Sequence, residues 1–146
     1  MERNYSNQYV IKDPDSGPAP CTMDIHQMAY QNANYRTALW TGHFLQLTVM
    51  SIPVGSEIGL EVHPDTDQFI RIESGVGKAV MGPDHNTLTY QCFIGRGDAV
   101  FVPAGTWHNV INSSKRPLKV STIYAPPHHP HGAVQKTKLQ ADIEEI

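Results

Sequence analysis

Short apolar segments separated by turn residues follow one another closely along most of the chain. Pro53 with Gly55 and Gly82 with Pro83 mark two of the turns between them. Strands this short and this closely spaced are typical of a β-sandwich or a closed barrel. The pattern predicts an all-β region over residues 35–125, with strands at 35–40, 44–52, 58–63, 68–73, 78–81, 88–93, 99–102, 107–111 and 118–124.

The alternation of side chains in residues 44–52 indicates how such strands pack. Successive residues of a strand point to opposite faces, so Leu47 and Val49 lie on one face and Met50 and Ile52 on the other. Both faces are apolar. We therefore expect a layer of other residues to cover each side of this strand.

The segments on either side of the predicted barrel have a different composition. Residues 1–34 are polar and rich in turn-forming residues, so we expect a mostly irregular arm with one short helix or turn at 24–30. Residues 126–146 form a tail in which a loop rich in proline and histidine precedes a charged stretch, and that stretch is expected to form a short helix. The chain contains no internal repeat, and we expect no second domain.

The bulk composition excludes several classes of partner. A chain of 146 residues is long enough for one domain with a core, and its net charge of -3 gives no electrostatic reason to expect nucleic acid or an anionic membrane as a partner. No apolar run resembles a signal peptide or a membrane span. Two cysteines are too few for a disulfide framework, so a cytoplasmic protein is expected, with Cys92 as a small buried hydrophobe.

The candidate chemistry begins with Glu61 and His63. Residues two apart on a strand point the same way, so this pair presents a carboxylate beside an imidazole, although such a pair is also common on a solvent-exposed edge strand. Pro64 begins a turn, and an antiparallel return strand would bring Gln68 close to the pair. Together with His108, these residues offer two imidazoles and one carboxylate, which suffice to hold a divalent transition metal with open positions.

The stretch around His108 has regularly placed turn residues. Gly97 opens one turn, Pro103 and Gly105 form another, and Asn112 closes the stretch. The two turns bracket the predicted strand 99–102. They therefore place His108 early in the strand that follows.

These residues resemble the two motifs of the cupin superfamily, in particular small single-domain cupins described as mannose-6-phosphate-isomerase-like. The second cupin motif, G-x5-P-x-G-x2-H-x3-N, is matched at every defined position. The first, H-x-H-x3,4-E-x6-G, is matched only in part. Glu61 stands at its first histidine, His63 at its second, Gln68 at its glutamate and Gly75 at its glycine.

The resemblance implies a cupin-type double-stranded β-helix, or jelly-roll barrel, around a divalent transition metal such as Fe, Mn, Ni, Co or Zn. Carried over by position, the metal ligands are Glu61, His63, Gln68 and His108. Glu61 is also a candidate general base. Gln68 offers a neutral amide oxygen, which either binds the metal or hydrogen-bonds to a water or substrate bound there.

The resemblance favours an enzyme that acts on a small polar metabolite by isomerisation, dioxygenation or decarboxylation. A non-catalytic module that binds a metal or metabolite and a structural protein with a vestigial barrel remain alternatives, since a fold does not determine a function. The histidines at 128, 129 and 131 form either a metal-binding tract or a proline-stiffened loop near the barrel mouth or surface. Strands that are apolar on both faces and the polar arm also predict a homodimer.

Overall fold

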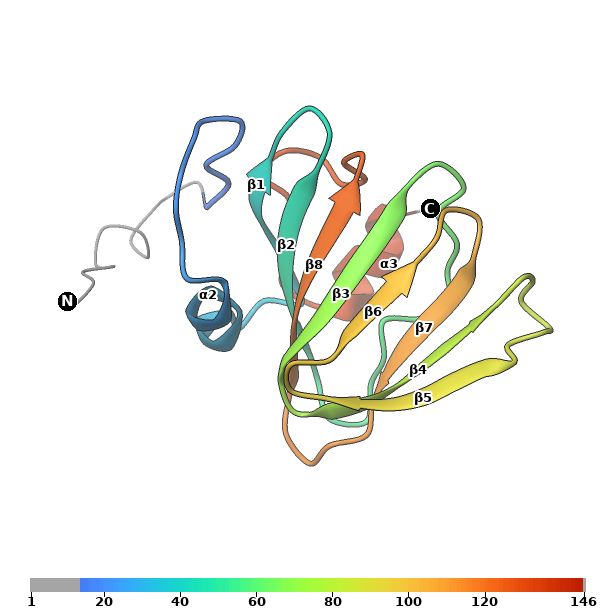
Figure 1. The fold of residues 1–146 in the computed structure, drawn as a ribbon. Helices are drawn as coiled ribbons and strands as arrows, with labels where there is room; N and C mark the ends of the chain where they lie inside the picture. The colour runs from blue at the N-terminus through green and yellow to red at the C-terminus, as the bar shows by residue number, and fades with distance from the viewer. Residues whose placement is uncertain (1–13, 146) are drawn as a thin grey trace.

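The structure is a computed structural model that describes residues 14–145. Two antiparallel sheets face each other and are accompanied by two short helices, which confirms the all-β prediction (Figure 1). The larger sheet has the order β6-β3-β8-β2-β1-β9, with β6 Ala99–Val102, β3 Asp67–Ser74, β8 Leu118–Ala125, β2 Gln46–Ile52, β1 Arg36–Thr41 and β9 Val134–Gln135. The smaller sheet has the order β5-β4-β7, with β5 Tyr90–Gly95, β4 Val76–Gly82 and β7 Trp107–Asn112.

One predicted strand is wrong. Residues 58–63 form no regular strand and join β7 only through isolated bridges at Glu57 and Glu61. The reason lies at Gly59, whose φ of 103° is incompatible with a regular strand. The Gly59 N–H donates to the Asn109 side-chain oxygen at 2.9 Å, so it takes no part in a ladder. The other predicted strands are present, and the two-residue β9 was not predicted.

Strand β2 separates two apolar clusters, as its alternation predicted. Met50 and Ile52 point between the two sheets, where they join the main core. Leu47 and Val49 point outward into a smaller cluster with Ala29 of helix α2 (Ile25–Gln31). The outer face of the larger sheet is therefore covered by the helix that the sequence placed at 24–30.

Both predicted helices begin at a capping side chain. Asp24 accepts a hydrogen bond from the Gln27 N–H at 3.0 Å at the start of α2. Thr137 accepts one from the Gln140 N–H at 3.1 Å at the start of α3, which spans Lys138–Glu144. Residues 1–13 of the predicted arm lie outside the described residues. Within the described part of the chain, no helix is long and apolar enough to cross a membrane.

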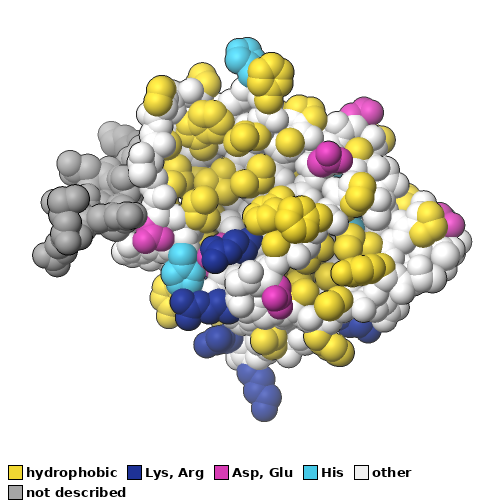
Figure 2. Space-filling model, viewed as in Figure 1, with side chains coloured by type: hydrophobic (Ala, Val, Ile, Leu, Met, Phe, Trp, Pro, Cys, Tyr) yellow, Lys and Arg dark blue, Asp and Glu magenta, His cyan; other side chains and the backbone are white. Residues whose placement is uncertain are grey.

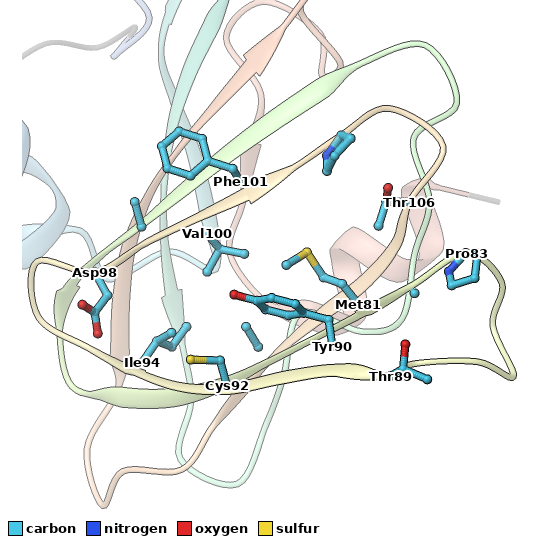
Figure 3. Close-up of a pocket in the computed structure, with 14 residues that line it drawn as sticks. Met81, Pro83, Thr89, Tyr90, Cys92, Ile94, Asp98, Val100, Phe101 and Thr106 are labelled. Atoms are coloured by element: carbon cyan, nitrogen blue, oxygen red, sulfur yellow. The ribbon is translucent and has the colours of Figure 1, made fainter.

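The predicted burial of Cys92 is also wrong. β5 is an edge strand that pairs only with β4, and Cys92 on it is exposed. Its side chain lines an apolar pocket of about 680 Å³ between β5 and β6 (Figure 3). Exposed Phe93 and Phe101 lie on the same two edge strands, and Figure 2 shows hydrophobic side chains spread over much of this face. The described residues that line the pocket do not include the four candidate ligands.

Candidate metal centre

Three of the four candidate ligands meet inside the barrel. The Glu61 Oε1 atom lies 3.3 Å from His63 Nε2 and 3.4 Å from His108 Nε2. One ligand atom from each of the three side chains falls within 4.8 Å of the other two. Glu61 and His63 come from the irregular segment before β3, and His108 is the second residue of β7. The structure therefore brings together residues that are up to 47 positions apart in the sequence.

Backbone hydrogen bonds hold the two contributing segments against each other. The Glu61 N–H donates to the His108 carbonyl at 3.0 Å, and the His108 N–H donates to the Glu61 carbonyl at 2.9 Å. The Gly105 N–H donates to the His63 carbonyl at 2.9 Å. Gly105 has a φ of 81°, which a residue with a side chain rarely adopts. The turn that the second motif requires thus also positions a ligand of the first motif.

Asn112 at the end of the second motif clamps the far end of β7. Its side-chain amide donates to the carbonyls of Ile52, Pro53 and Arg116 at 3.0, 3.1 and 2.9 Å. Its side-chain oxygen accepts from the Ser114 N–H at 2.8 Å. Asn112 is buried, so these bonds satisfy groups that water does not reach.

The histidine geometry fits a metal ion. His108 Nδ1 lies 2.9 Å from the Thr106 carbonyl, which can only accept, so Nδ1 carries the proton and Nε2 presents a lone pair. Among the residues described, that buried Nε2 has no hydrogen-bond partner, although the Glu61 carboxylate lies near it. Two atoms that each lie about 2.1 Å from one ion are about 3.0–3.4 Å apart at octahedral or tetrahedral angles. The distances of 3.3 and 3.4 Å match this spacing.

Gln68 lies near the centre, beside Tyr124, but by a different route from the one predicted. β3 pairs with β6 and β8 and not with residues 58–63, so the expected antiparallel return is wrong. Gln68 lies opposite Tyr124 in the register of β3 and β8, and the Tyr124 ring is 5.8 Å from the His63 ring. Its buried Oε1 has no hydrogen-bond partner among the described residues. This free oxygen suits either a metal or a molecule bound beside it.

The surroundings of Glu61 favour its ionised form. Burial acts to raise the pKa of this carboxyl, but its side-chain contacts with His108 and His63 outweigh burial. The pKa of Glu61 therefore lies well below its usual range. A carboxylate that stays charged at neutral pH is a strong ligand for a divalent cation.

The histidines after β8 separate into two groups. The His128 ring lies 4.1 Å from the His63 ring, between centroids, and His129 is buried behind it. Gln46 fixes this loop, because its side chain accepts from the His129 N–H at 2.9 Å and donates to the His129 carbonyl at 2.8 Å. His131 instead pairs with Asp15 of the arm at 3.3 Å. The first two histidines lie near the candidate centre and the third lies at the surface, as the prediction of a loop near the barrel mouth or surface allowed.

The electrostatics of the mouth loop keep its buried histidine neutral. Burial, with the nearby Arg36 charge, lowers the pKa of His129 to about 3. Burial and the charge of His63 also lower the pKa of His128. His128, His129 and Glu145 form a second group whose ligand atoms lie within 4.8 Å of one another.

Sequence reasoning missed Arg36 and Glu145. Arg36 is only 2% exposed, and Glu145 follows the C-terminal helix at the same end of the barrel. One signal for Arg36 was available in the sequence. It is the one charged residue of the strand Arg36–Thr41, most of which is buried in the structure. Nothing in the sequence indicated that the C-terminal helix would bring a carboxylate to it.

Comparisons with known proteins agree with this architecture. The family model described as "Cupin domain" matches residues 48–124. Protein YrkC of Bacillus subtilis (strain 168) is 50% identical over 127 residues, which cover 87% of this chain and 68% of YrkC. The crystal structure of BH2720 from Bacillus halodurans has a TM-score of 0.88 and 49% identity, and the match covers 89% of this chain and 98% of that one.

A more distant structure shares the fold alone. Oxalate decarboxylase from Bacillus subtilis is 21% identical with a TM-score of 0.54, and the match covers 60% of this chain and 22% of that enzyme. The family match spans more than half of the 146 residues and includes Gln68 and His108. Fold, motif positions and relatives lead to one conclusion, that this chain belongs to the cupin domain family.

Proposed function

We propose that this cupin is a metal-dependent enzyme that acts on a small polar metabolite. One observation carries the proposal, namely the convergence of Glu61 with two imidazoles, one of which has a buried and unpartnered Nε2. Two histidines and one carboxylate form the facial set that holds Fe(II) with open positions, and Mn, Ni, Co and Zn accept the same donors. The absence of thiolate from the set argues against a site selected for softer metals.

The residues around the centre divide the remaining work. When bound, a divalent metal supplies Lewis-acid polarisation of a substrate oxygen. Glu61 is the candidate general base by position, since its side chain is 19% exposed, whereas its lowered pKa makes it a weak base and a good metal ligand. Gln68 offers an amide that orients the substrate, because its Oε1 has no partner among the described residues. Tyr124 and His128 close the cavity beside His63 and limit access of water.

The chemistry we propose is isomerisation, dioxygenation or decarboxylation. Isomerisation and decarboxylation require a polarised oxygen and a group that moves a proton, and Glu61 can supply the second. Dioxygenation additionally requires O₂ as a co-substrate. The resemblance to oxalate decarboxylase concerns the fold and does not select among these reactions.

Metal content tests the centre directly. We expect elemental analysis of the gently purified protein to find one transition-metal ion per chain. Glu61→Ala should lose that ion, whereas Glu57→Ala, which removes a carboxylate from the same segment without touching the centre, should keep it. Retention of metal by Glu61→Ala would refute the assigned carboxylate.

Gln68→Ala separates the two roles open to the amide. If Gln68 binds the metal, metal occupancy should fall in this variant. If it contacts a bound water or substrate, occupancy should hold while substrate binding or turnover changes. Metal occupancy alone separates the two roles, so this test does not require the natural substrate.

The alternative is a non-catalytic module that holds a metal or metabolite. Incubation with Fe(II) and O₂, and separately with Mn or Zn without O₂, against small sugars and oxo acids distinguishes the two. Turnover that disappears in His108→Ala supports the enzyme. Tight metal binding without turnover of any of these compounds supports the module. The predicted homodimer stays a prediction, and a monomer in sedimentation at micromolar concentration would contradict it.

A further inference from the structure

Arg36 is a buried cation whose hydrogen-bonding capacity is largely unused. Its Nη1 donates to Gln135 Oε1, its Nη2 makes a long contact of 3.9 Å to Met50 Sδ, and the Tyr124 hydroxyl is a further polar neighbour. Its Nε has no hydrogen-bond partner among the residues described. A guanidinium carries five N–H donors and remains charged, so burying it with one good acceptor is costly.

The carboxylate nearest to this guanidinium is a poor partner. Glu145 Oε1 lies 4.0 Å from Arg36 Nη1, at the limit of an ion pair, and the Glu145 side chain is 42% exposed. A paired carboxylate normally meets arginine through two hydrogen bonds below about 3 Å. A loose and partly solvated pair contributes little and can be replaced by a better acceptor.

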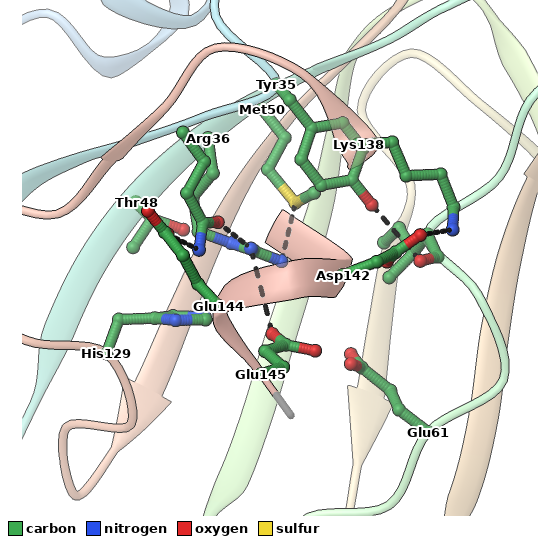
Figure 4. Close-up of polar contacts among 12 residues, drawn as sticks. Tyr35, Arg36, Thr48, Met50, Glu61, His129, Lys138, Asp142, Glu144 and Glu145 are labelled. Atoms are coloured by element: carbon green, nitrogen blue, oxygen red, sulfur yellow. Dashed lines mark hydrogen bonds and ion pairs between the residues drawn. The ribbon is translucent and has the colours of Figure 1, made fainter. Parts of the chain in front are cut away.

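Glu145 occupies the space between the arginine and the candidate metal centre. Figure 4 shows its carboxylate between the Arg36 guanidinium and the Glu61 carboxylate. Burial and the negative charge of Glu61 raise the pKa of Glu145, while Arg36 opposes them. Glu145 therefore lies where a small anion that contacted both Arg36 and the centre would have to lie.

A pocket lies beside this position, between the mouth loop and the end of α3. Its volume is about 490 Å³, and its lining includes His129, Glu145 and Gln135, the residue that binds Arg36. Arg36 itself and the three candidate ligands are not among the described residues that line it. His128 and His129 add imidazoles whose lowered pKa values keep them neutral, so they can hydrogen-bond to a ligand without adding charge. A second metal ion held by His128, His129 and Glu145 is disfavoured, because it would lie beside the buried guanidinium.

We infer that the barrel mouth is a binding site for a small carboxylate, anchored by the free N–H groups of Arg36 and occupied by Glu145 in the absence of ligand. A ligand carboxylate replaces Glu145 and forms the two-pronged pair that Glu145 does not make. The remainder of the ligand then points toward Glu61, His63 and His108. The contact of the ligand with Glu61, His63 and His108 rests on the proposed function. The binding of an anion by Arg36 does not require a metal.

Acetate titration of the full-length protein tests the site. We expect the side-chain Nε–H resonance of Arg36 in a ¹H–¹⁵N spectrum to shift and saturate with sodium acetate. Acetamide, which has the same shape without charge, should not shift it, and neither should sodium chloride at equal ionic strength. An Arg36 resonance that does not respond to acetate would overturn the inference.

Matched variants test the displacement of Glu145. Glu145→Gln removes the competing carboxylate and should raise the affinity for acetate about fivefold, measured by saturation transfer to the acetate methyl group. Asp142→Asn removes the same charge from the same helix, where Asp142 accepts from Lys138, and should leave the affinity unchanged. Equal gains in both variants would indicate a general effect of charge and would contradict a site built around Glu145.

Arg36→Lys keeps the charge and removes the planar fork. We expect acetate affinity to fall at least about tenfold in this variant. Thermal unfolding checks that it is folded, and if it is not, the Glu145→Gln comparison still decides. All titrations are run on chelator-treated and on metal-loaded protein. Acetate binding without any metal binding would refute the proposed function alone, and metal binding without an Arg36 response would refute this site alone.

Discussion

The two segments that supply the candidate metal centre differ in how strongly their sequence determines their shape. Residues 97–112 form a turn, a strand, a second turn and a second strand, and each motif residue has an identifiable backbone role. Residues 57–63 form no regular strand, and Glu61 stands there in place of the usual histidine, two residues before the usual His63. One segment is defined by its backbone and the other by the side chains that it presents.

This difference explains which motif could change. Gly97 and Gly105 have φ values of 88° and 81°, and Asn112 bonds to three carbonyls, so replacing any of them disturbs the chain path. Glu61 and Gln68 face a cavity, and their identity affects what the cavity binds more than how the chain folds. The second motif is therefore complete in this chain, whereas the first has exchanged its ligands.

The largest expected effect comes from breaking the backbone-defining segment at Asn112. Asn112→Ala removes the buried amide that donates to three carbonyls at the end of β7, so we expect the free energy of unfolding to fall by about 3 kcal/mol. Chemical denaturation measures it. Asn109→Ala is the matched control, because Asn109 is equally buried but accepts only from the Gly59 N–H, and it should cost about 1 kcal/mol. Equal losses would remove the distinction between the two segments.

A smaller effect is expected at Gly105. A Cβ added there meets no atom within 4 Å, so Gly105→Ala has only its positive φ to overcome, at a cost of about 1–2 kcal/mol. Gly95→Ala is the control, since a Cβ at Gly95 makes an ordinary contact of 3.6 Å with Val76 and no positive φ is involved. Thermal unfolding of the two variants gives the comparison. If Gly105→Ala is as stable as Gly95→Ala, the turn does not depend on glycine.

The same contrast explains how far the sequence could predict this molecule. The turns around β6 and the position of His108 were predictable, because glycine, proline and asparagine act locally on the chain. The path of residues 58–63 was not, since it depends on the left-handed Gly59 and on a bond to Asn109, 50 residues away. The meeting of Arg36 with Glu145 depends on where the C-terminal helix packs, which no local pattern records.

The smallest expected effect comes from restoring the usual first motif. The double variant Glu61→His with Gln68→Glu exchanges a carboxylate and a neutral group within one cavity and leaves the net charge of the motif unchanged. Because neither side chain defines the backbone, we expect the metal-free protein to change by less than about 1 kcal/mol in its free energy of unfolding. Metal affinity, measured by competition with a chelator, should stay within about tenfold of the parent, since three imidazoles and a carboxylate are also good donors.

The single variant Gln68→Glu is the control for this exchange. It places a second carboxylate in a cavity that already holds ionised Glu61, so the metal-free protein should be less stable than the double variant. Metal should relieve the repulsion and raise the stability of the single variant more than that of the double variant. If the double variant instead fails to fold while Gln68→Glu remains stable, Glu61 is required for the chain path between β2 and β3. The first segment would then be defined by its backbone as strictly as the second.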